Sequence, residues 1–174
     1  KPKSPHAGER RMITQKRLRE MLAYDPATGV FTWRVSRGGY VRSGFTAGYS
    51  RPDGYICIGV DKSPYLAHRL AWFFVTRKWP RREIDHINCI RDDNRITNLR
   101  EATFGENQQN VSVQTNNTSG YKGVTWDAAR GKWMAQITVD SVHVYLGRFG
   151  ILEDAAAAYA KASKRHHKDF GRLA

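Results

Sequence analysis

The chain has little cysteine, no long apolar run and few acidic side chains. Only Cys57 and Cys89 occur among 174 residues, which is too few for a four-ligand zinc site or a disulfide framework, so we expect both thiols to stay reduced. The basic N-terminal segment lacks the apolar stretch of a signal peptide, and no apolar run is long enough to predict a membrane span. These absences favour a cytoplasmic protein.

Positive charge is in excess. Lys and Arg number 29 against 16 Asp and Glu, which gives a formal net charge of +13. Such an imbalance favours a polyanionic partner, and nucleic acid is the first choice. A membrane surface would attract the same charge, but the chain has no basic amphipathic helix, so we expect no membrane partner and no small-molecule substrate.

The pattern changes along the chain and predicts two modules. Residues 1–12 mix charges with proline and glycine and predict a flexible basic arm. Residues 13–110 form the first module. Residues 111–119 are polar and turn-prone, as in a linker, and residues 120–174 form the second module.

The first module begins with a β-rich segment. A short helix is expected from Ile13 onward, with Thr14 as N-cap, followed by a turn. Residues 30–65 alternate aromatic and basic side chains between glycines and predict several short strands. A helix with an apolar stripe follows over residues 66–75.

The end of the first module places an Asp-His pair, a polar loop and a capped helix close together. The β-branched apolar residues Ile84 and Ile87 flank the pair, as in a short buried strand. Thr103 and Glu106 have the spacing of a capping box, which starts a helix and puts Asn107 in its first full turn. A strand end and a helix start therefore flank one loop.

These residue types suit the hydrolysis of a phosphodiester bond. The imidazole of His86 can accept a proton from water at neutral pH, so His86 is the candidate general base. Mg²⁺ is usually held by one or two protein oxygens and keeps waters in its other positions. Asp85 and Asn107 are the candidate ligands, with Mn²⁺ as a substitute ion.

The runs HRLAWFFV and DHINCIRDDNRITNLREAT resemble the HNH endonucleases of phage and mobile-intron origin, which are homing-type enzymes with the ββα-metal fold. The resemblance implies that Asp85 is a metal ligand and His86 the base. It implies that Asn98 orients the histidine or fixes the loop, and that Asn107 completes the metal site. Asn94 is the rival for the middle position.

Other histidines and one loop residue have simpler interpretations. Family members usually have Gly where this chain has Cys89, which predicts a backbone with positive φ there. His68 is expected to be a structural hydrogen-bonding residue or a phosphate neighbour. His166 and His167 are expected to lie on a solvated basic helix end.

The second module predicts a three-stranded antiparallel sheet and one helix. The strands are YKGVTW, GKWMAQITV and VHVYLGRF, and the helix is ILEDAAAAYAKASKRHHK. The four consecutive alanines would let the helix approach the sheet closely. Alternation puts two sets of side chains on opposite faces of the middle strand: Trp133, Ala135, Ile137 and Val139 on one, and Lys132, Met134, Gln136 and Thr138 on the other.

This pattern resembles the AP2 domain of plant transcription factors, through SGYKGVTW, GKWMAQI, YLGRF and EDAAAAYAKAS. The resemblance covers residues 119–174 and implies a sheet that lies in the major groove of DNA. Several strand arginines of the plant members are replaced here, so base preference does not transfer. The positions implied as DNA contacts, each also consistent with a plain surface residue, are Lys122, Thr125, Trp126, Arg130, Lys132, Gln136, Thr138, Tyr145 and Arg148.

The sequence therefore predicts an α+β chain: a β-rich segment, a ββα-metal nuclease module and an AP2-like sheet packed on one helix. Its expected function is a site-directed endonuclease that nicks double-stranded DNA, as a monomer or weak dimer, in a bacterial host if it is phage-encoded. The alternatives are a catalytically silent DNA-binding regulator and an enzyme acting on RNA, which fits an AP2-type sheet less well. Four arginines of the first module are expected either to contact DNA phosphates or to have only a structural role in the sheet. They are Arg34, Arg37, Arg42 and Arg51.

Overall fold

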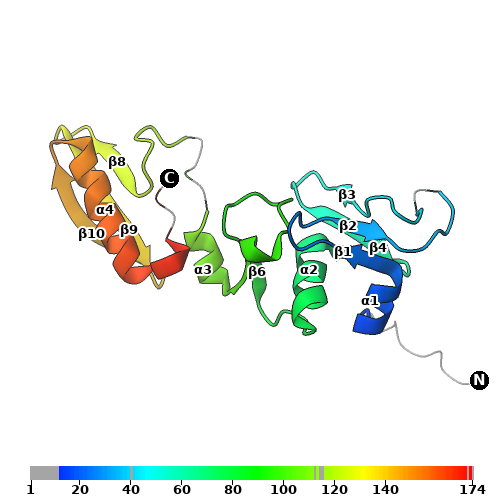
Figure 1. Cartoon of the computed structure of the whole chain (residues 1–174). Helices are drawn as coiled ribbons and strands as arrows, with labels where there is room; N and C mark the ends of the chain where they lie inside the picture. The colour runs from blue at the N-terminus through cyan, green and yellow to red at the C-terminus, as the bar shows by residue number, and fades with distance from the viewer. Residues whose placement is uncertain (1–11, 40, 112, 114–115, 172, 174) are drawn as a thin grey trace, which may run out of the picture. The chain divides into compact units, whose positions relative to one another are not determined.

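The computed structural model of the chain describes residues 12–39, 41–111, 113, 116–171 and 173 (Figure 1). The chain divides into two compact units, residues 1–101 and residues 102–174. Each unit has its own cluster of buried apolar side chains, as expected of independent domains. The predicted arm falls outside the described residues except for Met12, whose side chain is exposed.

The described residues of the first unit form three helical segments and three small sheets. The order of strands is β1-β2, β3-β4-β5 and β6-β7. The elements are α1 (Gln15–Met21), β1 (Leu22–Tyr24), β2 (Phe31–Trp33), β3 (Tyr49–Ser50), β4 (Ile56–Val60), β5 (Ser63–Leu66), α2 (Ala67–Thr76), β6 (Glu83–His86), the 3₁₀ turn η1 (Ile96–Asn98) and β7 (Leu99–Ala102).

Helices α1 and α2 confirm the sequence interpretation. The hydroxyl of Thr14 accepts a hydrogen bond from the backbone of Arg17, which caps α1. Leu18 of α1 and Leu70 of α2 are fully buried in the same core. Arg19 ties the helices together, because its guanidinium donates to the carbonyl of Phe74 at 2.6 Å.

The segment from β6 to α3 has the predicted strand–loop–strand–helix order. Ile84 and Leu99 anchor β6 and β7 in the core of the first unit. Helix α3 (Phe104–Gln109) follows directly, and both bonds of the Thr103–Glu106 capping box are formed. The loop between β6 and β7 is therefore held at both ends by paired strands.

The second unit is an antiparallel sheet with one long helix packed on it. The sheet has the order β10-β9-β8, and α4 packs on β9 and β10 (Figure 1). The elements after α3 are β8 (Val124–Asp127), β9 (Lys132–Val139), β10 (Val142–Phe149), α4 (Leu152–His166) and the 3₁₀ turn η2 (Lys168–Phe170).

Small side chains allow the close approach of α4 to the sheet. Ala155 is fully buried against Ala135 and Ile137, as the alanine run predicted. Gly123 has φ +68°, and a Cβ there would lie 2.3 Å from the ring of Tyr159. Glycine is therefore required where the chain enters β8.

The predicted linker contains an ordered turn. The hydroxyl of Ser119 is buried and donates to the carbonyl of Val124 at 2.8 Å, while the side chain of Asn117 accepts from Gly120. The compact units divide after Glu101, whereas the sequence placed the change at residues 111–119. The predicted boundaries of the nuclease module, the linker and the DNA-binding module stay a prediction. Among the described residues, no helix combines the length and apolarity that a membrane crossing needs.

Candidate active site and candidate DNA-binding face

Asp85 and His86 lie at the end of β6, where the sequence placed them. Their exposed fractions are 5% and 4%, so both are buried polar residues. Buried carboxylates and imidazoles are rare without partners, because their desolvation is costly. Each is held by side chains from a different part of the first unit.

His86 is held by Asn94 of the loop. The Nε2 atom of His86 lies 3.3 Å from Oδ1 of Asn94, whose Nδ2 donates to the carbonyl of Asp92. Since that carbonyl can only accept, the amide oxygen faces His86, and the neutral ring carries its proton on Nε2 and its lone pair on Nδ1. Burial lowers the pKa of His86, and the bond to Asn94 partly opposes this shift. The ring is therefore a neutral proton acceptor near pH 7.

Two further rings pack around His86. The ring of His68, from α2, meets it edge-on at a centroid distance of 5.0 Å, and the ring of Tyr55 lies 5.8 Å away. Burial and the neighbouring His86 lower the pKa of His68 to about 3, so His68 is neutral. Its Nδ1 atom has no hydrogen-bond partner among the described residues. The expected hydrogen bond is thus not seen at that atom, and the His68 ring packs against His86; the expectation that His68 is a phosphate neighbour stays a prediction.

Asn98 fixes the loop. Among the described residues, its side chain makes no hydrogen bond to the His86 ring. Its Oδ1 accepts from the backbone of Asn88, and its Nδ2 donates to Oδ1 of Asn88 and to the carbonyl of Asp93. Of the two roles considered for the middle asparagine, Asn94 takes the contact with the histidine ring and Asn98 takes the loop. Cys89 has φ +62°, which agrees with the glycine usual at that position.

Asp85 is paired with Arg100 of the neighbouring strand β7. Both Nε and Nη2 of Arg100 lie 2.8 Å from the same carboxylate oxygen, Oδ2. A buried carboxylate fits a hard divalent cation. No group of three or more His, Cys, Asp or Glu side chains that could hold a metal occurs in the described part of the chain. The described residues therefore offer the carboxylate of Asp85 as a donor that suits such an ion, and they show no closed cage of charged or imidazole ligands.

Asn107 lies on α3, as predicted, but in the second compact unit. Its backbone donates to the carbonyl of Thr103, in the first turn of the helix. Its role as the second metal ligand stays a prediction.

The exposed face of the sheet in the second unit carries most of the predicted DNA contacts. Directly paired residues of antiparallel strands share a face, so the register sets which side chains lie together. Ala135 and Ile137 point to α4, and their neighbours on β9 occupy the opposite face, as predicted. That face is called the polar face here and contains Thr125, Asp127, Lys132, Met134, Gln136, Thr138, His143, Tyr145 and Arg148.

Two arginines of this region share one acidic partner. Asp127 lies 2.7 Å from Nε of Arg148 and 3.2 Å from Nη1 of Arg130. The Arg148 guanidinium holds the pKa of Asp127 below its ordinary value, and Arg130 adds to this shift. Arg148 also donates to the hydroxyl of Tyr145 at 3.2 Å. The polar face thus holds a charged cluster whose carboxylate offsets part of its positive charge.

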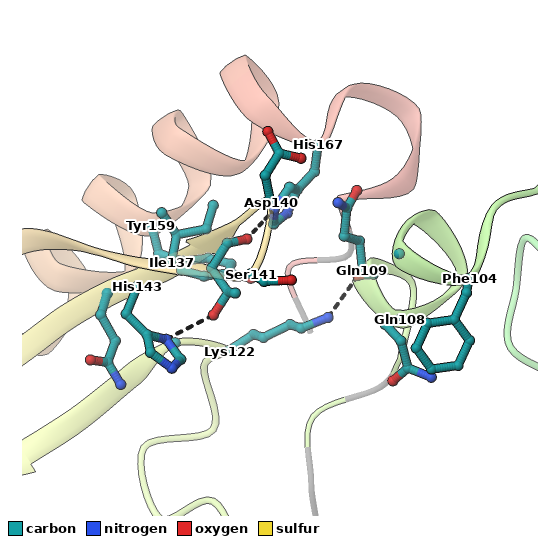
Figure 2. A pocket seen from close by; sticks show the side chains of 14 residues that line it. Phe104, Gln108, Gln109, Lys122, Ile137, Asp140, Ser141, His143, Tyr159 and His167 are labelled. Atoms are coloured by element: carbon teal, nitrogen blue, oxygen red, sulfur yellow. Dashed lines mark hydrogen bonds between the residues drawn. The ribbon is translucent and has the colours of Figure 1, made fainter.

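Three of the predicted contacts lie off the polar face: Arg130, in the turn between β8 and β9, and Trp126 and Lys122. Trp126 is paired with Trp133, and the two rings meet edge-on at 5.0 Å, so Trp126 lies on the side of the sheet that faces α4. Lys122 extends toward α3, where its Nζ donates to the carbonyls of Gln109 and Val111 at 2.7 and 2.9 Å (Figure 2). Both residues have structural partners in addition to any role on DNA.

Lys122 also lines a cavity of about 630 Å³ within the second unit, between α3 and the end of the sheet (Figure 2). His167 lines it too and is buried, with Nε2 at 2.9 Å from the carbonyl of Thr138. The prediction of a solvated histidine pair is therefore wrong for His167, although His166 is exposed. His167 thus joins the C-terminal end of α4 to β9. The basic residues around it had predicted an exposed helix end instead.

The arginines of the first module have mixed surroundings. Arg37 pairs with Asp61 at 3.0 Å and Arg51 pairs with Asp53 at 2.9 Å, while Arg42 lies over the ring of Phe45. These contacts stabilise loops of the first unit and leave a phosphate-binding role untested.

Comparison with known proteins places this site in a family. A model of the HNH endonuclease family matches residues 65–109, which include α2, both strands of the Asp-His site and α3. The chain is also 32% identical over 90 residues to Protein 3.8 of Escherichia phage T7, and this match covers 52% of the chain and 74% of the phage protein. No solved structure matches the chain.

Residues 65–109 thus form an HNH endonuclease domain, a family match that suggests nuclease activity on DNA with a divalent metal ion. More particularly, the chain belongs to the same family as Protein 3.8 of phage T7.

The sequence interpretation missed two residues of the site. Arg100 follows the asparagine-leucine element by one residue and sits on β7, where its guanidinium reaches Asp85. Tyr55 directly precedes β4 and is far from the motif in sequence. The strand pairing β6-β7 could have suggested Arg100, whereas no local signal points to Tyr55.

Proposed function

We propose that this protein is a DNA endonuclease that hydrolyses one phosphodiester bond per binding event, with His86 as general base and Asp85 and Asn107 as ligands of one Mg²⁺ ion. The observation that carries the proposal is the His86 ring itself, buried, neutral and held through Nε2 by Asn94. With the proton on Nε2, Nδ1 is the basic nitrogen of the ring and is the atom proposed to accept a proton from water.

The side chains of the site divide the work. Asn94 keeps the His86 ring in one tautomer, and the packing of Tyr55 and His68 restricts its rotation. Asn98 holds the loop that carries Asn94. The Mg²⁺ ion, when bound, would neutralise negative charge on the phosphoryl group and stabilise the departing oxygen.

The second unit is proposed to read DNA as an AP2-like domain. The support is its three-stranded sheet packed on one helix, with a polar face opposite that helix. A sheet of this kind fits the major groove of B-form DNA and fits the narrow groove of A-form RNA poorly. Arg148, Gln136 and Lys132 are the proposed contacts to bases and phosphates, with Thr125, Thr138, Tyr145 and Arg130 beside them. In this assignment Trp126 and Lys122 support the sheet and α3.

The second candidate is a DNA-binding regulator whose nuclease site is silent. One observation favours it: Arg100 occupies an oxygen of the carboxylate that would hold the metal. Against it stands the preserved contact between His86 and Asn94, which a silent scaffold would not need.

Supercoiled plasmid discriminates between the two. The protein is incubated with plasmid and either Mg²⁺, Mn²⁺ or EDTA, and the open-circle product is quantified. The endonuclease predicts metal-dependent conversion to open circles. Binding of the plasmid without conversion under any metal would favour the regulator.

A further inference from the structure

The ion pair between Asp85 and Arg100 joins neighbouring strands inside the site. The Asp85 side chain is 5% exposed and the Arg100 side chain is 17% exposed, so water screens the pair weakly. The Nε and Nη2 atoms of Arg100 both lie 2.8 Å from one oxygen of Asp85, Oδ2. A buried carboxylate in such surroundings needs a positive partner, because an uncompensated charge there is costly.

The same carboxylate is the one that the proposed function gives to a divalent cation. Arg100 and that cation would both be partners of Asp85, and they repel each other. A unit charge and a divalent ion about 5 Å apart repel enough to weaken cation binding by about tenfold even in water, and more where screening is weaker. Strong cation binding therefore needs Arg100 to find another partner.

A phosphodiester offers Arg100 that partner. A guanidinium donates to phosphate oxygens as it does to carboxylate oxygens, so the hydrogen bond from Nε of Arg100 to Asp85 can be replaced by one to a phosphate. The Arg100 side chain is more exposed than the Asp85 side chain, so of the two partners Arg100 is the one nearer to solvent.

We propose that Arg100 is an exchangeable counter-ion of Asp85. In the free protein its guanidinium neutralises the carboxylate. When DNA binds, the guanidinium moves to a phosphate oxygen and the carboxylate takes the divalent cation, so no buried charge is left without a partner at any stage. This inference rests on the proposed function, and it makes cation binding and DNA binding strengthen each other.

The first test measures the binding of Mn²⁺ to the whole chain without DNA, by the loss of the free-ion electron paramagnetic resonance signal. Arg100→Gln should bind Mn²⁺ at least about tenfold more tightly than wild type, because the competing charge is gone. Arg17→Gln is the matched control, since Arg17 also pairs with an aspartate, Asp61, but outside the site. It should bind Mn²⁺ as wild type does. Arg100→Met keeps the packing of the stem and gives the same reading if the Gln variant does not fold.

The second test measures the reciprocal effect on DNA affinity, in a His86→Ala chain so that the duplex stays intact. Mn²⁺ should raise the affinity of this chain for duplex DNA relative to EDTA. In a chain that also carries Arg100→Gln, the increase in DNA affinity caused by Mn²⁺ should be smaller by about threefold or more, because Asp85 of that chain already binds the cation without DNA.

Weaker or unchanged Mn²⁺ binding by Arg100→Gln would overturn the proposal, since it would make Arg100 a fixed support of Asp85. An unchanged increase of DNA affinity in the second test would also overturn it. Plasmid cleavage by the wild-type chain is scored separately. A chain that cuts DNA while Arg100→Gln binds Mn²⁺ weakly keeps the proposed function and loses only the counter-ion.

Discussion

The candidate active site of the first unit buries its polar side chains, whereas the polar face of the second unit displays them on the exposed side of a sheet. In the first unit Asp85, His86, Asn94 and Asn98 are all less than a tenth exposed. His86 contacts Asn94, Asn98 bonds to the loop, and Asp85 pairs with Arg100. On the polar face of the second unit, side chains such as Tyr145 remain half exposed. The difference matches two tasks, because chemistry needs fixed, dry groups and recognition needs groups that a partner can reach.

The two units also balance charge differently. The first pairs its buried carboxylate with one arginine, and the second offsets two arginines with one carboxylate, Asp127. Changes in the first unit should therefore act on the cleavage rate, and changes on the polar face should act on DNA affinity. The following substitutions test this division, from the largest effect to the smallest.

Asp85→Asn should lower the cleavage rate by about 10³-fold or more, because a neutral amide holds a divalent ion poorly and charge neutralisation is worth several kcal/mol. Single-turnover cleavage of plasmid measures the rate, and a gel-shift titration measures affinity. A variant that cuts within tenfold of wild type would show that Asp85 does not hold the metal.

Asn94→Ala and Asn98→Ala should separate orientation from loop stability. Asn94→Ala should slow cleavage by about 10- to 100-fold, because the His86 ring loses its orienting partner. Asn98→Ala should lower the free energy of unfolding by about 1–3 kcal/mol, because it leaves buried loop groups without their bonds. Single-turnover rates measure the first effect and thermal melting the second. A stable, slow Asn98→Ala variant and an unstable, active Asn94→Ala variant would exchange the two roles.

Asp127→Asn should strengthen DNA binding. The pKa of Asp127 is lowered by Arg148, so the carboxylate is charged at neutral pH and its loss releases Arg148 and Arg130 to phosphates. The slope of log affinity against log salt should steepen by about one unit. Asp53→Asn, which removes the partner of Arg51 in the first unit, is the control and should leave the slope unchanged. Weaker binding by Asp127→Asn would show that the carboxylate positions the arginines for DNA.

Cys89→Gly should stabilise the chain slightly. Cys89 has φ +62°, a conformation that costs a residue with a side chain about 1 kcal/mol. Glycine removes this strain, but the greater entropy of its unfolded chain cancels about half of the gain. The expected rise in melting temperature is small, about 1–3 °C. A fall would show that the thiol makes contacts worth more than the strain.

The sequence predicted the elements better than the contacts between them. The capping box of α3, the cap of α1 and the alanine run of α4 are local signals, and all three are seen. The division of labour between Asn94 and Asn98 depends on how the loop folds back, so spacing alone left both open. The burial of His167 and the reach of Lys122 depend on packing between distant segments, which a local pattern does not encode.

The central claim is tested most directly by His86→Ala in single-turnover cleavage of plasmid with Mg²⁺, with DNA affinity measured on the same preparation. We predict that cleavage falls by about 10²- to 10⁴-fold, the usual contribution of a general base, while DNA affinity stays within about twofold of wild type. Wild-type cleavage by this variant would contradict the account, because the imidazole would then have no part in activating water.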